Sequence, residues 1–157
     1  MRQDRFLLGI LIGIAVLAVA AVLVFFTRQE QVAYRPGQEP DDVVHNYVMA
    51  VMDKDYDRAY GYLADLIDKP TFEEFRQAFA VGRVMPGQNG IRIGEPEISG
   101  DSASVAVTTI YQQSDPFSSG YSELGSAQLL RQQGSWRISS MPVYEIWDFA
   151  WYQSQPK

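Results

Sequence analysis

The chain contains one histidine, His45, and no cysteine. A histidine in a triad or a metal site needs partner residues, and the sequence has neither a G-x-S-x-G elbow nor an H-E-x-x-H helix motif. The absence of cysteine excludes disulfides, thiolate catalysis and cysteine-ligated zinc or iron–sulfur centres. On a helical wheel His45 lies beside an apolar face. We therefore interpret it as a boundary residue of a helix, and we assign no catalytic residue, metal site or cofactor.

Three carboxylates form a D-x-D-x-D pattern at Asp53, Asp55 and Asp57. This pattern is typical of the start of a calcium-binding loop. An EF-hand loop beginning at Asp53 would need Gly at its sixth position and Glu at its twelfth, where this chain has Arg58 and Ala64. The spacing therefore predicts the end of one helix, a turn and the start of the next helix.

Aromatic side chains are the remaining candidates for a site. Four of them could line a pocket between helices and sheet: Tyr47, Tyr60, Tyr111 and Trp136. Such a pocket would suit a small apolar ligand. Aromatic residues at these spacings also form ordinary hydrophobic cores, which is the competing interpretation.

The charge of the chain excludes one class of partner. From Pro36 to Lys157 there are nine Lys or Arg against seventeen Asp or Glu, which leaves a net charge near −8. A field of this sign repels phosphate backbones. We therefore expect no nucleic-acid binding.

Residues 6–26 are twenty-one residues without a charge, long enough for a helix to span the hydrocarbon layer of a membrane. A cleaved signal peptide is the alternative, because Ala18-Val19-Ala20 has the form of a cleavage site. The apolar run continues beyond Ala20, which favours a retained transmembrane helix. Gly9 and Gly13 form a G-x-x-x-G pattern that can bring two such helices together.

Basic residues flank this segment on both sides. Arg2 and Arg5 lie in the short N-terminal segment 1–5, and Arg28 and Arg35 lie in the polar segment 27–39. The balance, together with the amino terminus, slightly favours a cytoplasmic N-terminus in a cell membrane. The following domain is then extracytoplasmic, and the polar tether of about a dozen residues holds it close to the bilayer.

Three helices are predicted after the tether. Val44, Tyr47, Val48, Val51 and Met52 follow one helical face in a helix from Pro40 to about Lys54. Asp55 can cap a second helix, whose buried face would be Ala59, Tyr60, Leu63, Leu66 and Ile67. Thr71-Phe-Glu-Glu74 is a capping box that begins the third.

Strands are predicted after Gly82, where β-branched and aromatic residues dominate. The segments are Ile91–Ile98, Ala103–Gln112, Ser122–Gln132 and Ser135–Ser140, the last two joined by a Gln133-Gly134 turn. The order predicts an α+β domain over residues 40–140, with about three helices packed on a curved antiparallel sheet of about four strands. The aromatic tail 141–157 favours a short final helix over an extra strand.

The run from Pro40 to Leu63 resembles the opening of the NTF2-like (cystatin-like) superfamily, in particular its small bacterial membrane-anchored members of the DUF4878 type. The match includes Asp55, Ala59, Tyr60 and Leu63, and Trp136 resembles the usual Trp of the final hairpin. The resemblance implies a cone-like sheet around helices. Its pocket is catalytic in some relatives and a binding or assembly surface in others, and no catalytic position carries over to this chain.

Two functions follow as hypotheses. The first is a single-pass membrane-anchored, noncatalytic interaction domain, an accessory or assembly subunit whose partners are the bilayer and other membrane protein subunits. Its contacts would be Trp147, Phe149, Trp151 and Tyr152, unless the tail packs back on its own sheet. The second is a small apolar ligand-binding protein, or an isomerase-like or dehydratase-like enzyme, with a buried carboxylate beside a Tyr or His45.

Overall fold

The computed structural model describes residues 10–21, 34–87, 89–111 and 120–152 of the chain. The chain divides into two compact units, Met1–Ala33 and Tyr34–Lys157. In the first unit, residues 10–21 are helical and include Gly13. The two ends of the predicted span, with Gly9, lie outside the described residues, as do residues 1–5 and 27–33. Among the described residues, none of the helices combines the length and the apolar character needed to cross a membrane.

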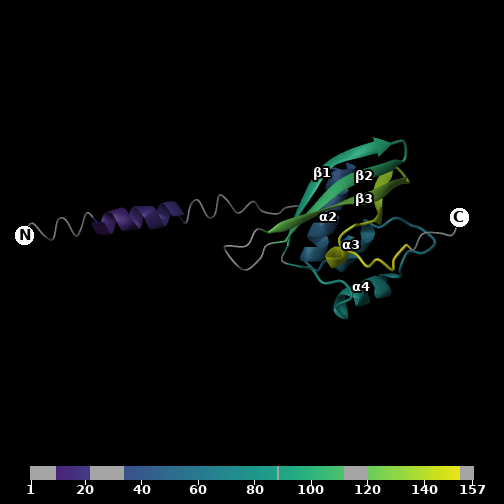
Figure 1. Ribbon diagram of the computed structural model, residues 1–157, viewed down its shortest axis with the longest axis horizontal. Helices are drawn as coiled ribbons and strands as arrows, with labels where there is room; N and C mark the ends of the chain where they lie inside the picture. Colours follow the sequence, from purple (N-terminus) through teal and green to yellow (C-terminus); the bar gives the residue numbers. More distant parts are fainter. Residues whose placement is uncertain (1–9, 22–33, 88, 112–119, 153–157) are drawn as a thin grey trace, which may run out of the picture. The chain divides into compact units, whose positions relative to one another are not determined.

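The second unit has the predicted α+β class. Its α-helices are α2 (Pro40–Met52), α3 (Tyr56–Gly61) and α4 (Phe72–Ala80). Its strands are β1 (Gly90–Ser99), β2 (Ser102–Tyr111), β3 (Tyr121–Gln132) and β4 (Ser135–Ser140), followed by the short 3-10 helix η1 (Tyr144–Ile146). The strands form one antiparallel sheet in the order β1-β2-β3-β4. Helix α2 contacts β1, β2 and β4, so it lies against one face of this sheet (Figure 1).

The first helix forms as predicted. Pro40 begins α2, and its apolar face buries Val44, Tyr47 and Val51 completely. The helix ends at Met52, two residues before the predicted end, since Lys54 adopts a left-handed backbone with φ 60°.

The D-x-D-x-D pattern marks two helix ends, which confirms its interpretation. Asp53 caps the C-terminus of α2. The side chain of Asp55 accepts a hydrogen bond from the backbone N–H of Arg58, 3.2 Å away, at the start of α3. Asp57 lies in the first turn of that helix. Each carboxylate thus compensates the partial positive charge of unpaired N–H groups or faces solvent in the turn.

Helix α3 is shorter than predicted, and the expectation that Leu66 and Ile67 lie on its buried face is wrong. The backbone leaves the helix after Gly61 and pairs with β4. The N–H of Ile138 donates to the carbonyl of Tyr62, and the N–H of Ala64 donates to the carbonyl of Ile138, both at 2.8 Å. This pairing satisfies the groups that a longer helix would have paired internally, and it leaves Ile67 83% exposed.

Two other local predictions are confirmed. The Thr71 hydroxyl and the Glu74 carboxylate form both halves of the capping box at the start of α4, which packs Phe75 and Phe79 into the core. Strands β3 and β4 form the hairpin, and its turn residues Gln133 and Gly134 have φ values of 51° and 80°. Two positive values in succession are typical of the tight turn that matches strand twist.

The aromatic tail does not form the final helix predicted for it. Its described part, residues 141–152, contains only the three-residue η1. Trp147 is extended, with φ −150° and ψ 136°. Its apolar side chains have helical spacing, but they pack into the core from an irregular backbone, so no amphipathic helix is needed to bury them.

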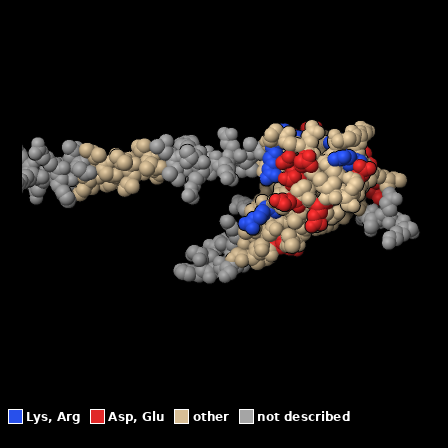
Figure 2. Space-filling model, turned by 90° about the horizontal axis from the view of Figure 1, so that it is seen from above, with Lys and Arg blue, Asp and Glu red and all other residues tan. Residues whose placement is uncertain are grey.

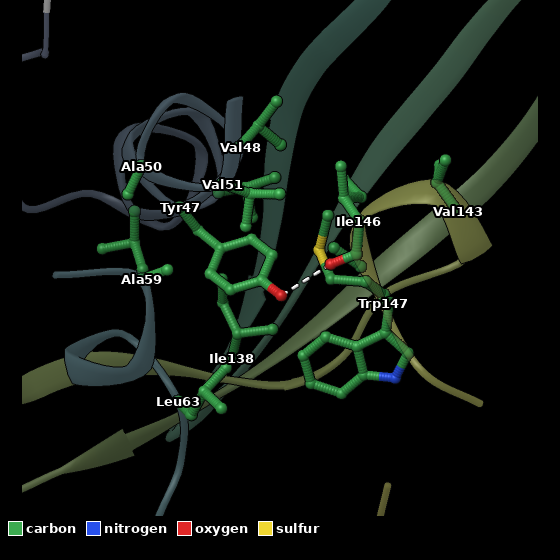
Figure 3. Close-up of a cluster of buried hydrophobic side chains, with 14 of the residues drawn as sticks. Tyr47, Val48, Ala50, Val51, Ala59, Leu63, Ile138, Val143, Ile146 and Trp147 are labelled. Atoms are coloured by element: carbon green, nitrogen blue, oxygen red, sulfur yellow. Dashed lines mark hydrogen bonds between the residues drawn. The ribbon is translucent and has the colours of Figure 1, made fainter. Parts of the chain in front are cut away.

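The tail closes the core against α2. The Tyr47 hydroxyl donates a hydrogen bond to the carbonyl of Ile146 at 2.6 Å, ninety-nine residues along the chain (Figure 3). The Tyr47 and Trp147 rings meet edge to face with centroids 6.1 Å apart. Val51, Leu63 and other apolar side chains surround this contact, so the interior between α2 and the sheet is filled.

Candidate functional site

The four aromatic residues predicted to line a pocket do not lie together. Tyr47 is buried in the filled interior. The Tyr60 hydroxyl donates to the carbonyl of Pro70 at 2.8 Å, and its ring packs edge-on against Phe75. Tyr111 and Trp136 line two different depressions of the surface.

One depression combines apolar walls with buried acidic chemistry. We call it the Glu145 pocket; its volume is about 180 Å³. It is lined by Val107, Thr109 and Tyr111 of β2, by Glu123, Leu124 and Gly125 of β3, and by Pro142, Val143, Tyr144, Glu145 and Phe149 of the tail. Two neighbouring strands and the returning tail therefore build one site.

The register of the sheet explains how β2 and β3 form these walls. Val107, Thr109 and Tyr111 alternate along β2, so they share one face. Tyr111 pairs with Tyr121 across the strands, and their rings stack with centroids 4.5 Å apart. Val107 pairs with Gly125, where a Cβ atom would lie 2.3 Å from Cβ of Pro142. The missing side chain lets the tail pass directly over β3.

Glu145 is the unusual residue of the pocket. Its side chain is 7% exposed, and its Oε1 atom accepts a hydrogen bond from Nδ2 of Asn89 at 3.4 Å. Its buried Oε2 atom has no hydrogen-bond partner among the described residues. A buried acceptor left unpaired costs about 1–3 kcal/mol. The fold thus keeps an unpaired carboxyl oxygen buried within a residue that lines the pocket.

The second buried carboxyl group of the tail is compensated. Oδ2 of Asp148 has no partner with hydrogen-bond geometry, but it lies 2.5 Å from Nη2 of Arg83 in an ion pair. Oδ1 of Asp148 accepts from the N–H of Ala150 at 2.9 Å. A cation at this distance offsets the cost of burying the carboxylate. Glu145 has no such cation among the described residues.

Tyr111 is coupled to this carboxyl group. Burial raises its pKa to about 12, and the negative charges of Glu145 and Glu123 add to the effect. The Tyr111 hydroxyl donates to Oε2 of Glu123 at 3.4 Å. These carboxylates oppose formation of a phenolate beside them.

We expect Glu145→Gln to lower the pKa of Tyr111 from about 12 toward its ordinary value, because one of the repelling charges is removed. Folding raises this pKa, so Tyr111 contributes stability that is full below the unfolded value and falls as pH rises through the folded value. The measurement is an alkaline titration of the tyrosine ring-carbon NMR signals, with Tyr111→Phe for assignment. An unchanged Tyr111 titration in Glu145→Gln would contradict the coupling.

Three of the four predicted partner contacts are engaged within the domain. Trp147 and Trp151 are buried. The hydroxyl of Tyr152 donates to the carbonyl of Ala64, and burial raises the pKa of Tyr152, with smaller contributions from Tyr60 and Asp65. Phe149 is 64% exposed and lies at the Glu145 pocket. The tail thus packs on its own domain, and Phe149 is the one predicted contact that stays largely exposed.

Sequence reasoning missed Glu145, Leu124 and Tyr144 as site residues. A signal for Glu145 existed, because it stands in the apolar run Val143-Tyr-Glu-Ile-Trp147. Such a context predicts burial of the acidic side chain between its neighbours. Among the described residues, no group of three or more potential ligands is placed to hold a metal ion.

Comparisons with known proteins yield distant structural similarities. No protein-family model matches the sequence, and no curated protein matches it. A SEC-C motif containing protein from Rhodopseudomonas palustris has a TM-score of 0.49 at 15% identity, covering 68% of this chain and 79% of its own. A Campylobacter jejuni protein described as an NTF2-like transpeptidase has a TM-score of 0.43 at 18% identity. The match covers 64% of this chain and 96% of that one.

A cystatin fold protein from Novosphingobium aromaticivorans is similar at the same level. Its TM-score is 0.41 at 14% identity, and the match covers 65% of this chain and 97% of that one. At these scores the similarities carry no inference about function.

Proposed function

We propose that this chain is a membrane-anchored, noncatalytic interaction domain of the NTF2-like, DUF4878 type, an accessory or assembly subunit of a membrane protein complex. Residues 6–26 would anchor it in the cell membrane with its N-terminus in the cytoplasm. The polar segment 27–39 would then hold the acidic domain outside, near the bilayer. Support for the anchor comes from the charge-free length of the segment.

The observation that supports an interaction surface is the exposed apolar rim of the Glu145 pocket. Tyr144 and Phe149 are 48% and 64% exposed, and both line that pocket. Apolar side chains exposed singly are ordinary, but neighbouring ones around one concavity are typical of a binding site. Charged groups on the face drawn in Figure 2 lie in small separate clusters with uncharged surface between them.

The alternative is a small apolar ligand-binding protein or an isomerase-like or dehydratase-like enzyme. A buried Glu145 near Tyr111 is the arrangement that this hypothesis requires. The packed side chains around Tyr47 and the small volume of the Glu145 pocket argue against this ligand-binding alternative. The exposed rim is also unnecessary for a buried ligand, so interaction is the better-supported function.

The test is recovery of partners with the full-length, affinity-tagged chain from cross-linked, detergent-solubilised membranes, followed by mass spectrometry. We expect membrane proteins that copurify with the native chain to be lost in the double variant Tyr144→Ser, Phe149→Ser. The matched control is Ile67→Ser, which changes an apolar residue that is 83% exposed and lies outside the pocket. Recovery as a free monomer, or equal recovery with both variants, would refute an interaction role for the rim.

A further inference from the structure

The charges of the Glu145 pocket are all of one sign. Its lining includes two carboxyl groups, Glu123 and Glu145, and no Lys or Arg among the described residues. The second depression, around Trp136, has the opposite character, since Arg35, Arg58 and Arg137 line it. A cation therefore has an electrostatic reason to enter the Glu145 pocket, and an anion does not.

The two carboxyl groups differ in their free capacity. Glu123 accepts from the Tyr111 hydroxyl at 3.4 Å. Glu145 is held from one side by Asn89 through Oε1, while Oε2 is buried without a donor among the described residues. Oε2 is closed off from water, so a cation in the pocket would meet Glu145 through the attraction of its charge, which is strong in a site shielded from water.

The walls match the stem of a long basic side chain. Tyr144 and Phe149 are apolar and exposed at the rim, and Tyr111 adds a ring beside the carboxyl groups. Lysine and arginine carry an apolar stem that lies against such surfaces while the charged end reaches a polar partner. A volume of about 180 Å³ holds more than one water molecule, whose share of liquid is about 30 Å³.

We propose that the Glu145 pocket binds a basic side chain, lysine or arginine, of the partner protein. The charged end of that side chain lies beside the carboxyl groups of Glu145 and Glu123, and the stem packs on Tyr144 and Phe149. This inference deepens the proposed function and depends on it for the source of the side chain. The chemistry of the site itself can be tested without any partner.

The experiment titrates the full-length chain in detergent micelles with Nα-acetyl-lysine methyl amide. The readout is the NMR shifts of methyl groups at Val107, Leu124 and Val143, all in the lining. We expect saturable shifts with this probe. The same compound with an acetylated Nε, which is uncharged, is expected to bind at least about tenfold more weakly, because the attraction of its charge to the carboxyl groups is lost.

Variants separate the carboxyl group from the rest of the surface. Glu145→Gln keeps the size of the side chain and is expected to weaken binding of the charged probe about tenfold or more. Glu97→Gln, an exposed carboxyl group on β1, is the matched control and leaves binding unchanged. Methyl shifts of Val44 and Val51 in the core report whether each variant remains folded. Glu145→Asp, which retracts the carboxyl group, is expected to bind at an intermediate strength.

The outcomes distinguish this inference from the proposed function. Equal binding of charged and uncharged probes, equal binding by native and Glu145→Gln chains, or no methyl shift at all would overturn the inference. If partners are still lost with the rim variant in that case, the proposed function stands. If the charged probe binds through Glu145 but the rim variant loses no partner, the chemistry of the site stands and the proposed function fails.

Discussion

Trp151→Ala is expected to lower the free energy of unfolding by about 3–5 kcal/mol, the usual cost of removing a buried tryptophan. Trp151 is 7% exposed and stacks on Phe75 with ring centroids 4.9 Å apart. It also meets Trp147 edge to face at 5.2 Å. The substitution removes the ring that joins the tail to α4 and leaves a cavity against Phe75. Chemical unfolding of the full-length chain, followed by near-UV circular dichroism, measures the change.

The matched control is Phe149→Ala two residues earlier in the same tail. Phe149 is exposed, so its removal is expected to change stability by less than about 0.5 kcal/mol. The pair of variants separates two roles of the tail. Substitution of a core residue lowers the stability of the domain, and substitution of a contact residue lowers its binding to partners. If Trp151→Ala unfolded at the same denaturant concentration as the native chain, the packing of the tail on the domain would be refuted.

Gly125→Val is expected to destabilise the domain by about 3 kcal/mol, because overpacking a tight contact forces the backbone to move. A Cβ atom at Gly125 would lie 2.3 Å from Cβ and 2.7 Å from Cγ of Pro142. Strand β3 is paired with β2 at this position, so the tail is the part that must shift. A displaced Pro142 would open the Glu145 pocket, and we expect the lysine probe to bind more weakly.

Gly61→Ala is the control for this substitution. A Cβ atom at Gly61 would meet no heavy atom within 4 Å, and the residue ends α3. The free energy of unfolding of the Gly61→Ala variant is expected to stay within about 1 kcal/mol of the native value. Thermal unfolding of both variants compares the two glycines directly. Equal stability of Gly125→Val and the native chain would mean that the tail does not lie over β3 at this point.

Local signals predicted most of the fold. The apolar period at Val44, Tyr47 and Val51 identified α2, and the capping box at Thr71 identified α4 within one residue. The Gln133-Gly134 turn fixed the hairpin, because both residues adopt positive φ. These features depend on neighbours within a few residues, so a pattern in the chain is sufficient to find them.

Long-range pairing explains the two errors. The helical spacing of Leu63, Leu66 and Ile67 gave no sign that Leu63 would pair with Ile138, seventy-five positions away. The tail likewise had helical spacing, but the hydrogen bond from Tyr47 to Ile146 and the stack on Phe75 hold it in an irregular path. Helix propensity and helical spacing are weak evidence for a helix, and tertiary contacts of this kind override them.

The candidate site was predicted only in part. Tyr111 and Phe149 were named from the sequence, and both line the Glu145 pocket. The position of Glu145 at this site depends on the path of the tail over β2 and β3. No spacing between Glu145, Glu123 and Tyr111 could show that they meet, since three separate segments contribute them. Surface sites built from the returning end of a chain have this property in general.

The contact between Tyr47 and Ile146 has a consequence for the order of folding. Contacts between residues far apart in sequence form slowly, because a long loop must close before they are gained. The core around α2 is therefore incomplete until Trp147 and Trp151 have been synthesised and have left the ribosome. Until that moment the part of the core that Trp147 and Trp151 cover is exposed, and a nascent domain is open to association through it.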